Sequence, residues 1–184
     1  MRTEDFYLLF GLADNQEELL ESMKELPKPE VIGKYSVPED LNDITLEALI
    51  YLTESKTDDK FIENVEKWVL KVDEKDKGLL IDEPAEITLA LTNWVYGELD
   101  RIGKLFGSTR IEPTQEEKTA GIETLNFGWF GIVDSFAKRM TITHDAAEQT
   151  KWIIIFQCMR MDSLQAQYER RLQKVYENKH KHRR

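Results

Sequence analysis

The sequence predicts an all-α fold, a single-domain helical bundle or orthogonal array of about 6–8 helices. Apolar residues recur at spacings of three and four, which is the period of an amphipathic helix. Prolines and glycines gather between these stretches, where short connections are expected. The 184 residues are 41% hydrophobic and 33% charged, which fits a helical protein with thin layers and much solvated surface.

The chain divides into an arm, a linker, a main domain and a tail. We expect residues 1–26 to form an N-terminal helical arm of two helices. An irregular linker with Pro and Gly follows over residues 27–44, with a short extended piece at 34–37. The main helical domain covers residues 45–178. Residues 179–184 are expected to be a basic disordered tail.

In the first half of the main domain, residues 45–52 predict a short buried helix. The next helix starts at Thr57 or Asp58, and its polar face includes Glu66. Asp82 is expected to cap the longest helix. Its apolar stripe consists of Ile87, Leu91, Trp94, Val95, Leu99, Ile102 and Phe106.

In the second half, Thr114 to Glu117 reads as a capping box at a helix start. Thr143 is expected to cap a helix that contains the apolar run 152–156. Three β-branched residues there also suit a buried strand, but the flanking residues favour a helix. A last helix begins at Asp162 or Ser163. Between these lies a helix whose inward residues are Trp129, Ile132, Val133, Phe136 and Met140.

The net charge of −10 is unevenly distributed. Residues 160–184 hold eight Lys or Arg against three Asp or Glu, whereas residues 1–159 hold 17 against 32. The acidic body repels phosphates and so disfavours binding to nucleic acid. The same asymmetry permits head-to-tail contact between copies, as in a homo-oligomer, or docking of the basic end on an acidic partner.

Cysteine usage and hydropathy indicate where in the cell the protein is expected. Cys158 is the single cysteine, which excludes a disulfide framework and a thiolate metal cluster within one chain. The first residues do not form a signal peptide, and no apolar run is long enough to span a membrane. We therefore expect a cytoplasmic protein without membrane contact.

No catalytic or metal-binding constellation stands out, so we expect neither an enzyme nor a cofactor. His144 and Cys158 would lie about 21 Å apart along one predicted helix, too far for a nucleophilic pair. Glu116 and Glu117 suit a helix start, where the macrodipole favours carboxylates. An alternative is a helical enzyme acting on nucleotides, which requires these two residues, Glu123 or Asp134 to converge in one pocket.

One segment is better explained by contact with another chain. Two glycines stand three residues apart at a helix start among large aromatic side chains, where glycine would allow another backbone to approach closely. Tight packing within one domain is the other interpretation. The proposed partner-binding residues here are Phe127, Gly128, Trp129, Phe130 and Gly131.

The basic C-terminal helix supplies two more proposed partner-binding residues, Arg170 and Arg171. A regulator that binds nucleic acid through this helix is a further alternative. Glu169 and Glu177 interrupt the basic face, and no aromatic residue interleaves it for base stacking, which favours a solvated face instead.

The layout of several motifs resembles that of tail assembly chaperones, small helical proteins encoded among the tail genes of bacteriophages. The resemblance covers about residues 37 to 175. It implies non-catalytic binding to a long helical tape-measure protein during tail assembly in the host cytoplasm. The motifs are Val37-Pro38-x-x-Leu41, Leu41-Asn42-Asp43-Ile44-Thr45, Phe127-Gly128-x-Phe130-Gly131, Trp152, and Tyr168-Glu169-Arg170-Arg171-Leu172.

Overall fold

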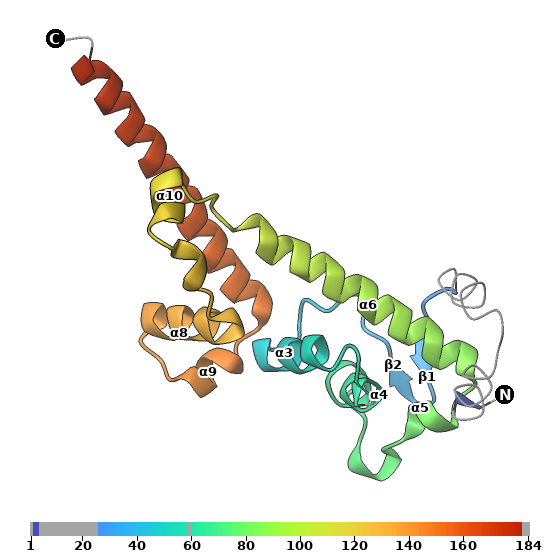
Figure 1. Ribbon diagram of the computed structural model, residues 1–184. Coiled ribbons are helices and arrows are strands. Elements are labelled where there is room, and N and C mark those ends of the chain that lie inside the picture. The colour runs from blue at the N-terminus through green and yellow to red at the C-terminus, as the bar shows by residue number, and fades with distance from the viewer. Residues whose placement is uncertain (1, 4–25, 59, 182–184) are drawn as a thin grey trace. The chain divides into compact units, whose positions relative to one another are not determined.

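Helices dominate the structure, a computed structural model that describes residues 2–3, 26–58 and 60–181 (Figure 1). The described ranges contain eight α-helices, α3 to α10, and a single two-stranded sheet. The prediction of an all-α fold is therefore confirmed. Both helices expected in the N-terminal arm, and the last three residues of the tail, lie outside the described residues.

The chain forms two compact units, residues 1–102 and 103–184. The division falls inside residues 45–178, for which we expected one main domain. It also falls within the longest helix before the C-terminal one, α6 (Ala85–Ser108), because residues up to Ile102 belong to unit 1 and the rest to unit 2.

Unit 1 opens with a hairpin in the expected linker. Strand β1 (Val31–Ile32) pairs antiparallel with β2 (Tyr35–Ser36). Gly33 has φ +56°, a left-handed conformation that glycine adopts without steric cost, and it makes the two-residue turn between the strands. The extended piece expected at residues 34–37 is thus one arm of a hairpin.

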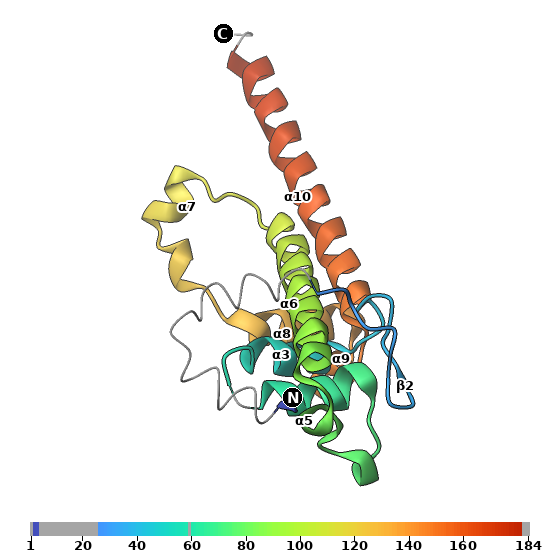
Figure 2. The same cartoon turned by 90° about the vertical axis from the view of Figure 1, so that its right-hand side faces the viewer.

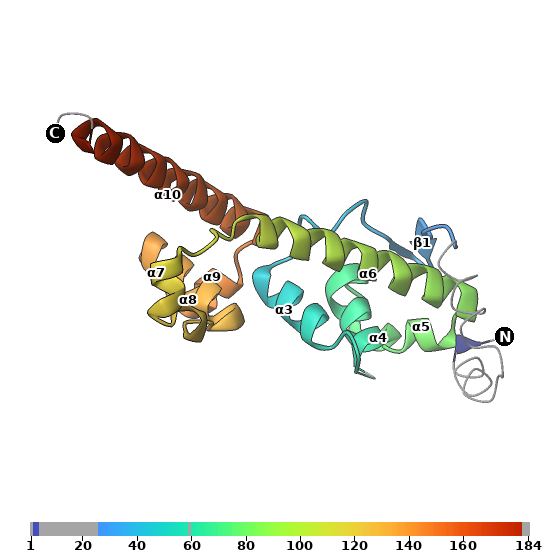
Figure 3. The same cartoon turned by 45° about the horizontal axis from the view of Figure 1, so that its top comes forward.

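Helix α3 (Leu46–Glu54) forms as predicted. The hydroxyl of Thr45 accepts a hydrogen bond from the backbone N–H of Ala48 at 3.2 Å and caps the helix. Its apolar side chains Leu46, Leu49 and Leu52 are buried. Figures 1 and 3 show α3 lying with α4 (Phe61–Asn64) and α5 (Leu79–Asp82) along one side of α6.

The placement of Glu66 on a polar face was wrong, since its side chain is only 3% exposed. Helix α4 continues into a π-helix, η1 (Val65–Leu70), in which backbone bonds span five residues. This wider turn shifts the side-chain register and turns Glu66 inward. Its carboxylate accepts hydrogen bonds from the N–H groups of Gly78 (2.9 Å) and Leu80 (2.7 Å).

Asp82 does not cap α6, contrary to our prediction. A short 3₁₀ turn, η2 (Glu74–Asp76), leads to α5, and Asp82 is the last residue of α5. In the first turn of α6, the carbonyl of Pro84 accepts hydrogen bonds from the N–H groups of Ile87 and Thr88. Four residues of the predicted α6 stripe are buried: Leu91, Val95, Leu99 and Ile102.

Unit 2 begins with the end of α6 and then α7 (Gln115–Thr119), whose predicted capping box is present. A 3₁₀ turn, η3 (Ile122–Thr124), leads to α8 (Gly128–Met140). The inward face of α8 buries Val133 and Phe136 as predicted. Met140 was also expected inward, but it is 50% exposed because it ends the helix after the last buried turn.

The C-terminal part was predicted with its helix boundaries in the wrong places. Thr143 does cap a helix, α9 (His144–Glu148), but that helix is short. The hydroxyl of Thr150 donates to the carbonyl of Ala146 at 2.9 Å, a local bond that competes with helix continuation. Then α10 (Trp152–Lys181) runs without interruption, so no helix starts at Asp162 or Ser163, and residues 179–181 continue the helix.

Exposed apolar side chains are concentrated in unit 2. Of the large apolar residues that are exposed among those described, only Val31, Tyr51 and Ile81 belong to unit 1. Unit 2 buries a small core around Val133, Phe136 and Trp152. Figure 2 shows α10 running on past the other helices of this unit. Unit 2 therefore offers apolar surface that its own fold does not cover.

Candidate protein-binding cleft

An aromatic cluster holds three helices of unit 2 together. Phe106, near the end of α6, lies 5.9 Å between ring centroids from Trp129 of α8 and from Trp152 and Phe156 of α10. Centroid distances of 4.5–7 Å are those of favourable aromatic pairs. One ring thus fixes the positions of α6, α8 and α10 within this unit.

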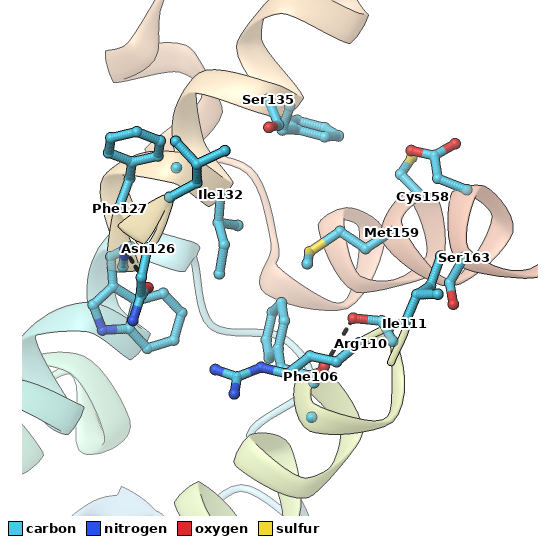
Figure 4. Close-up of a pocket in the computed structure, with 18 of the residues that line it drawn as sticks. Phe106, Arg110, Ile111, Asn126, Phe127, Ile132, Ser135, Cys158, Met159 and Ser163 are labelled. Atoms are coloured by element: carbon cyan, nitrogen blue, oxygen red, sulfur yellow. Dashed lines mark hydrogen bonds between the residues drawn. The ribbon is translucent and has the colours of Figure 1, made fainter. Parts of the chain in front are cut away.

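Beside this cluster lies a cleft of about 1080 Å³, formed entirely by residues of unit 2 (Figure 4). Its volume exceeds what a small cofactor needs and suits several side chains of a peptide. The apolar side chains around it come from the α6–α7 connection, the η3–α8 junction, α8 and α10. They include Ile111, Leu125, Phe127, Ile132, Met159 and Ala166.

Two arginines give the cleft its polar features. The guanidinium of Arg139 pairs with Asp162 and also donates to the carbonyl of Cys158, and the ion pair raises the pKa of Arg139. The guanidinium of Arg110 has no hydrogen bond or ion pair with any other residue in the described ranges. Its side chain points into the cleft in Figure 4. A ligand carboxylate could therefore bind Arg110 without displacing an existing partner.

The glycine–aromatic segment lies at this cleft. Four of its five proposed residues line the cleft: Phe127, Gly128, Trp129 and Gly131. Phe130 instead packs edge-to-face on His144 of α9, with ring centroids 5.4 Å apart. Phe127 and Phe130 are about equally exposed, at 64% and 62%, but only Phe127 faces the cleft.

The two glycines serve different purposes. Gly128 has φ +53°, and a Cβ built on it would meet nothing within 4 Å, so no described backbone occupies the space beside it. A Cβ on Gly131 would lie 3.1 Å from the Cβ of Phe127. Gly131 therefore lets Phe127 lie close against the first turn of α8, and Gly128 lets the chain enter that turn.

The two proposed arginines have separate roles. Arg170 donates to both carboxylate oxygens of Glu117, at 2.9 and 3.1 Å, and to the carbonyl of Glu112. Glu117 also completes the capping box with Thr114, so Arg170 ties α7 to α10. Arg171 is exposed on α10, and neither arginine lines the cleft.

The carboxylates that an enzyme would require do not line the cleft. Glu117 is bound by Arg170, whereas Asp134 accepts from Lys138 at 2.6 Å. The Lys138 hydrogen bond, with a smaller effect from His144, lowers the pKa of Asp134. Glu116 is exposed at the start of α7, and the side chain of Glu123 lies outside the description.

The expectation that His144 and Cys158 share one helix was wrong, because α9 ends before α10 begins. His144 contacts Asp134 and Phe130, whereas Cys158 is half-buried and lines the cleft. The described residues include no group of three or more His, Cys, Asp or Glu that could hold a metal ion. The same residues include no helix long and apolar enough to cross a bilayer.

No match to this chain was found among protein-family models, curated proteins or solved structures. The cleft itself must therefore indicate the function. Sequence patterns pointed to one wall of it, the η3–α8 junction. They gave no sign of Arg110, Arg139 or Met159, which no motif contains and which the fold alone brings to the cleft.

Proposed function

We propose that this chain is a non-catalytic assembly protein that binds a helical partner protein in the unit 2 cleft. The observation that carries the proposal is the concentration of exposed apolar side chains in unit 2 around a cleft with aromatic walls. Apolar patches of this kind mark interaction sites in folded proteins. Aromatic anchors such as Phe127 commonly supply much of the binding energy at an interface.

The charge of unit 2 suggests which partner surface fits. Residues 103–184 hold 14 Lys or Arg against 10 Asp or Glu, whereas residues 1–102 hold 11 against 25. Arg110 adds a guanidinium inside the cleft that has no partner among the described residues. These features favour a partner helix that presents apolar side chains together with a carboxylate.

The motif layout shared with phage tail assembly chaperones suggests the biological setting. We propose that the partner is the long helical tape-measure protein of a phage or prophage tail, bound in the host cytoplasm during assembly. A tape-measure gene beside the gene for this chain would support this setting. The cleft residues themselves support only the coarser proposal of helix binding.

The test is binding of the full chain to the tape-measure protein encoded beside it, measured by co-purification and by titration calorimetry. Phe127→Ser removes a cleft side chain, and Phe130→Ser removes an equally exposed phenylalanine outside the cleft. We expect Phe127→Ser to weaken binding at least about tenfold and Phe130→Ser to leave it within about twofold.

Two results would contradict the proposal. If the wild-type chain forms no complex with the tape-measure protein, the tail-assembly assignment is wrong. If both serine variants bind as the wild type does, the cleft is not the binding surface. Arg110→Glu provides an independent check, because it should weaken binding most at low salt, where an ion pair contributes most.

A further inference from the structure

Residues 111–126 connect the end of α6 to the start of α8, and we call this segment the strap. It contains the short helix α7 and the 3₁₀ turn η3. Ile111 and Asn126, at its two ends, lie on opposite sides of the cleft in Figure 4. Figure 2 shows the middle of the strap, α7, standing away from α10. The strap therefore bridges the cleft from one side to the other.

Apolar packing contributes little to holding the strap in place. None of its described side chains is buried, and Ile122 and Leu125 are 37% and 65% exposed. In the described structure, its backbone-to-backbone hydrogen bonds all join residues of the strap itself. A segment with few buried contacts and exposed backbone bonds opens at a low cost in free energy. The strap is therefore the part of unit 2 that moves most easily.

One residue of another helix holds the strap. Beyond the residues that flank it in the chain, Arg170 of α10 is the only described residue that hydrogen-bonds to the strap, with the side chain of Glu123 outside the description. Its guanidinium donates to both carboxylate oxygens of Glu117 and, at 2.9 Å, to the carbonyl of Glu112. Both charged side chains are 37% exposed, so water and salt weaken their attraction. This link has a specific geometry and yet breaks reversibly.

Two glycines give the strap places at which to turn. Gly121 follows α7 within the strap, and Gly128 begins α8 just after it. Their φ angles are +83° and +53°, and a Cβ built on either glycine would meet nothing within 4 Å. Both therefore serve the backbone conformation rather than close packing. Hinges in proteins are a few loop or element-terminal residues that absorb large changes in φ and ψ, and these two glycines suit that role.

We propose that the strap controls access to the cleft and that Arg170 holds it closed. When the ion pair between Arg170 and Glu117 breaks, the strap turns away on Gly121 and Gly128 and opens the cleft on that side. A helix with its side chains is about 10–12 Å across, so it needs such an opening to enter the cleft. That the entering ligand is the partner helix rests on the proposed function, whereas the opening of the strap does not.

The first test measures the position of the strap without any partner. In the full chain with Cys158→Ser, spin labels at Ala120→Cys on the strap and Gln173→Cys on α10 report the distance between the two segments. We expect a narrow distance distribution, which Arg170→Ala broadens and shifts to longer distances. Arg171→Ala removes the same charge from the next residue and should change nothing, because Arg171 has no hydrogen bond or ion pair with the described strap. Circular dichroism checks that all variants stay helical.

The second test measures access to the cleft in the chain with its natural cysteine. Cys158 is half-buried and lines the cleft, so its rate of reaction with the neutral reagent N-ethylmaleimide reports how open the cleft is. We expect Arg170→Ala to raise this rate about fivefold, as for loss of one exposed ion pair, and Arg171→Ala to change it less than about twofold. Glu117→Gln should have an intermediate effect, because glutamine keeps the capping-box acceptor but carries no charge.

An unchanged distance distribution in Arg170→Ala would overturn the strap as a moving element. A changed distribution with an unchanged Cys158 rate would overturn its control of the cleft. If the wild-type chain forms no complex with the tape-measure protein, the proposed function fails, and both measurements still decide whether the strap opens. If the complex forms, Arg170→Ala should associate with it at least about twofold faster in stopped flow, because strap opening no longer limits the rate. An equal or slower rate would overturn the role of the strap in admitting the partner.

Discussion

Glu66 is a buried carboxylate whose two oxygens each accept one backbone hydrogen bond. The donors are Gly78 and Leu80, at the start of α5, so this side chain connects the π-helix η1 to the next helix of unit 1. Hydrogen bonds to a charged group contribute more than neutral ones, and a buried N–H left without an acceptor is costly. The Glu66 carboxylate is therefore a main stabilising contact between η1 and α5.

We predict that Glu66→Gln destabilises unit 1 by about 2 kcal/mol, because the amide NH₂ of glutamine cannot accept the second hydrogen bond. Glu63→Gln is the matched control, since Glu63 is an exposed glutamate three residues before Glu66. Urea unfolding followed by circular dichroism measures both. Equal stability of the two variants would show that the Glu66 bonds contribute little.

Glu66 also shows where local pattern stops being informative. The caps at Thr114 and Thr143 were predictable because each hydroxyl accepts a hydrogen bond from an N–H three residues later in the chain. The burial of Glu66 depends on a π-helix, which shifts the side-chain register away from the α-helical period. A pattern based on 3.6 residues per turn cannot place such a residue.

At the scale of elements, Glu98 of α6 links this helix to the segment that precedes α3. Its carboxylate accepts hydrogen bonds from the side chain of Arg101 at 2.7 and 2.8 Å and from the N–H of Leu41 at 3.0 Å. The Arg101 bond, with the bond from Leu41, lowers the pKa of Glu98 despite its partial burial. The ionised carboxylate is therefore the form that the folded state prefers.

The lowered pKa predicts acid sensitivity. An unfolded glutamate has a pKa of about 4.3, so the contribution of Glu98 is fully present above that pH and is lost as pH falls through the lower folded-state pKa. We expect Glu98→Gln to be less stable than the wild type at pH 7. The difference should shrink as the pH is lowered from about 5 to 3, measured by urea unfolding at each pH. A difference that stays constant with pH would contradict this.

Element boundaries were less predictable than element types. The apolar run at residues 152–156 is helical as predicted, but the helix starts at Trp152 and continues to Lys181. Asp162 and Ser163 have the chemistry of caps, yet Ser163 is buried and Asp162 pairs with Arg139. The burial of Ser163 and the ion pair of Asp162 both arise from tertiary packing, which local sequence does not reveal.

For the whole molecule, the charge asymmetry seen in the sequence follows the division into units. The excess of Asp and Glu belongs to residues 1–102, and residues 103–184 carry a small excess of Lys and Arg. The cleft and the exposed apolar side chains of α10 both belong to the second range. The sequence pointed to one wall of the cleft, whereas Phe106, Arg110 and Met159 reach it only through the packing of unit 2.

The two units are expected to unfold separately, because each is a compact cluster with its own core. Leu49 is buried in unit 1, and Leu49→Ala should destabilise that unit by about 2–5 kcal/mol. Fluorine-labelled tryptophan gives one NMR signal per residue. Trp68 and Trp94 report on unit 1, and Trp129 and Trp152 report on unit 2.

In urea, Leu49→Ala should lower the unfolding midpoints of Trp68 and Trp94 and leave those of the two unit 2 tryptophans unchanged. Ile155→Ala should do the reverse, since Ile155 is fully buried in unit 2. If either substitution shifts the unfolding midpoints of all four tryptophans by the same amount, the chain unfolds as one cooperative body and the two units are not independent. Separate midpoints would mean that unit 2 can change its contacts during partner binding while the core of unit 1 stays folded.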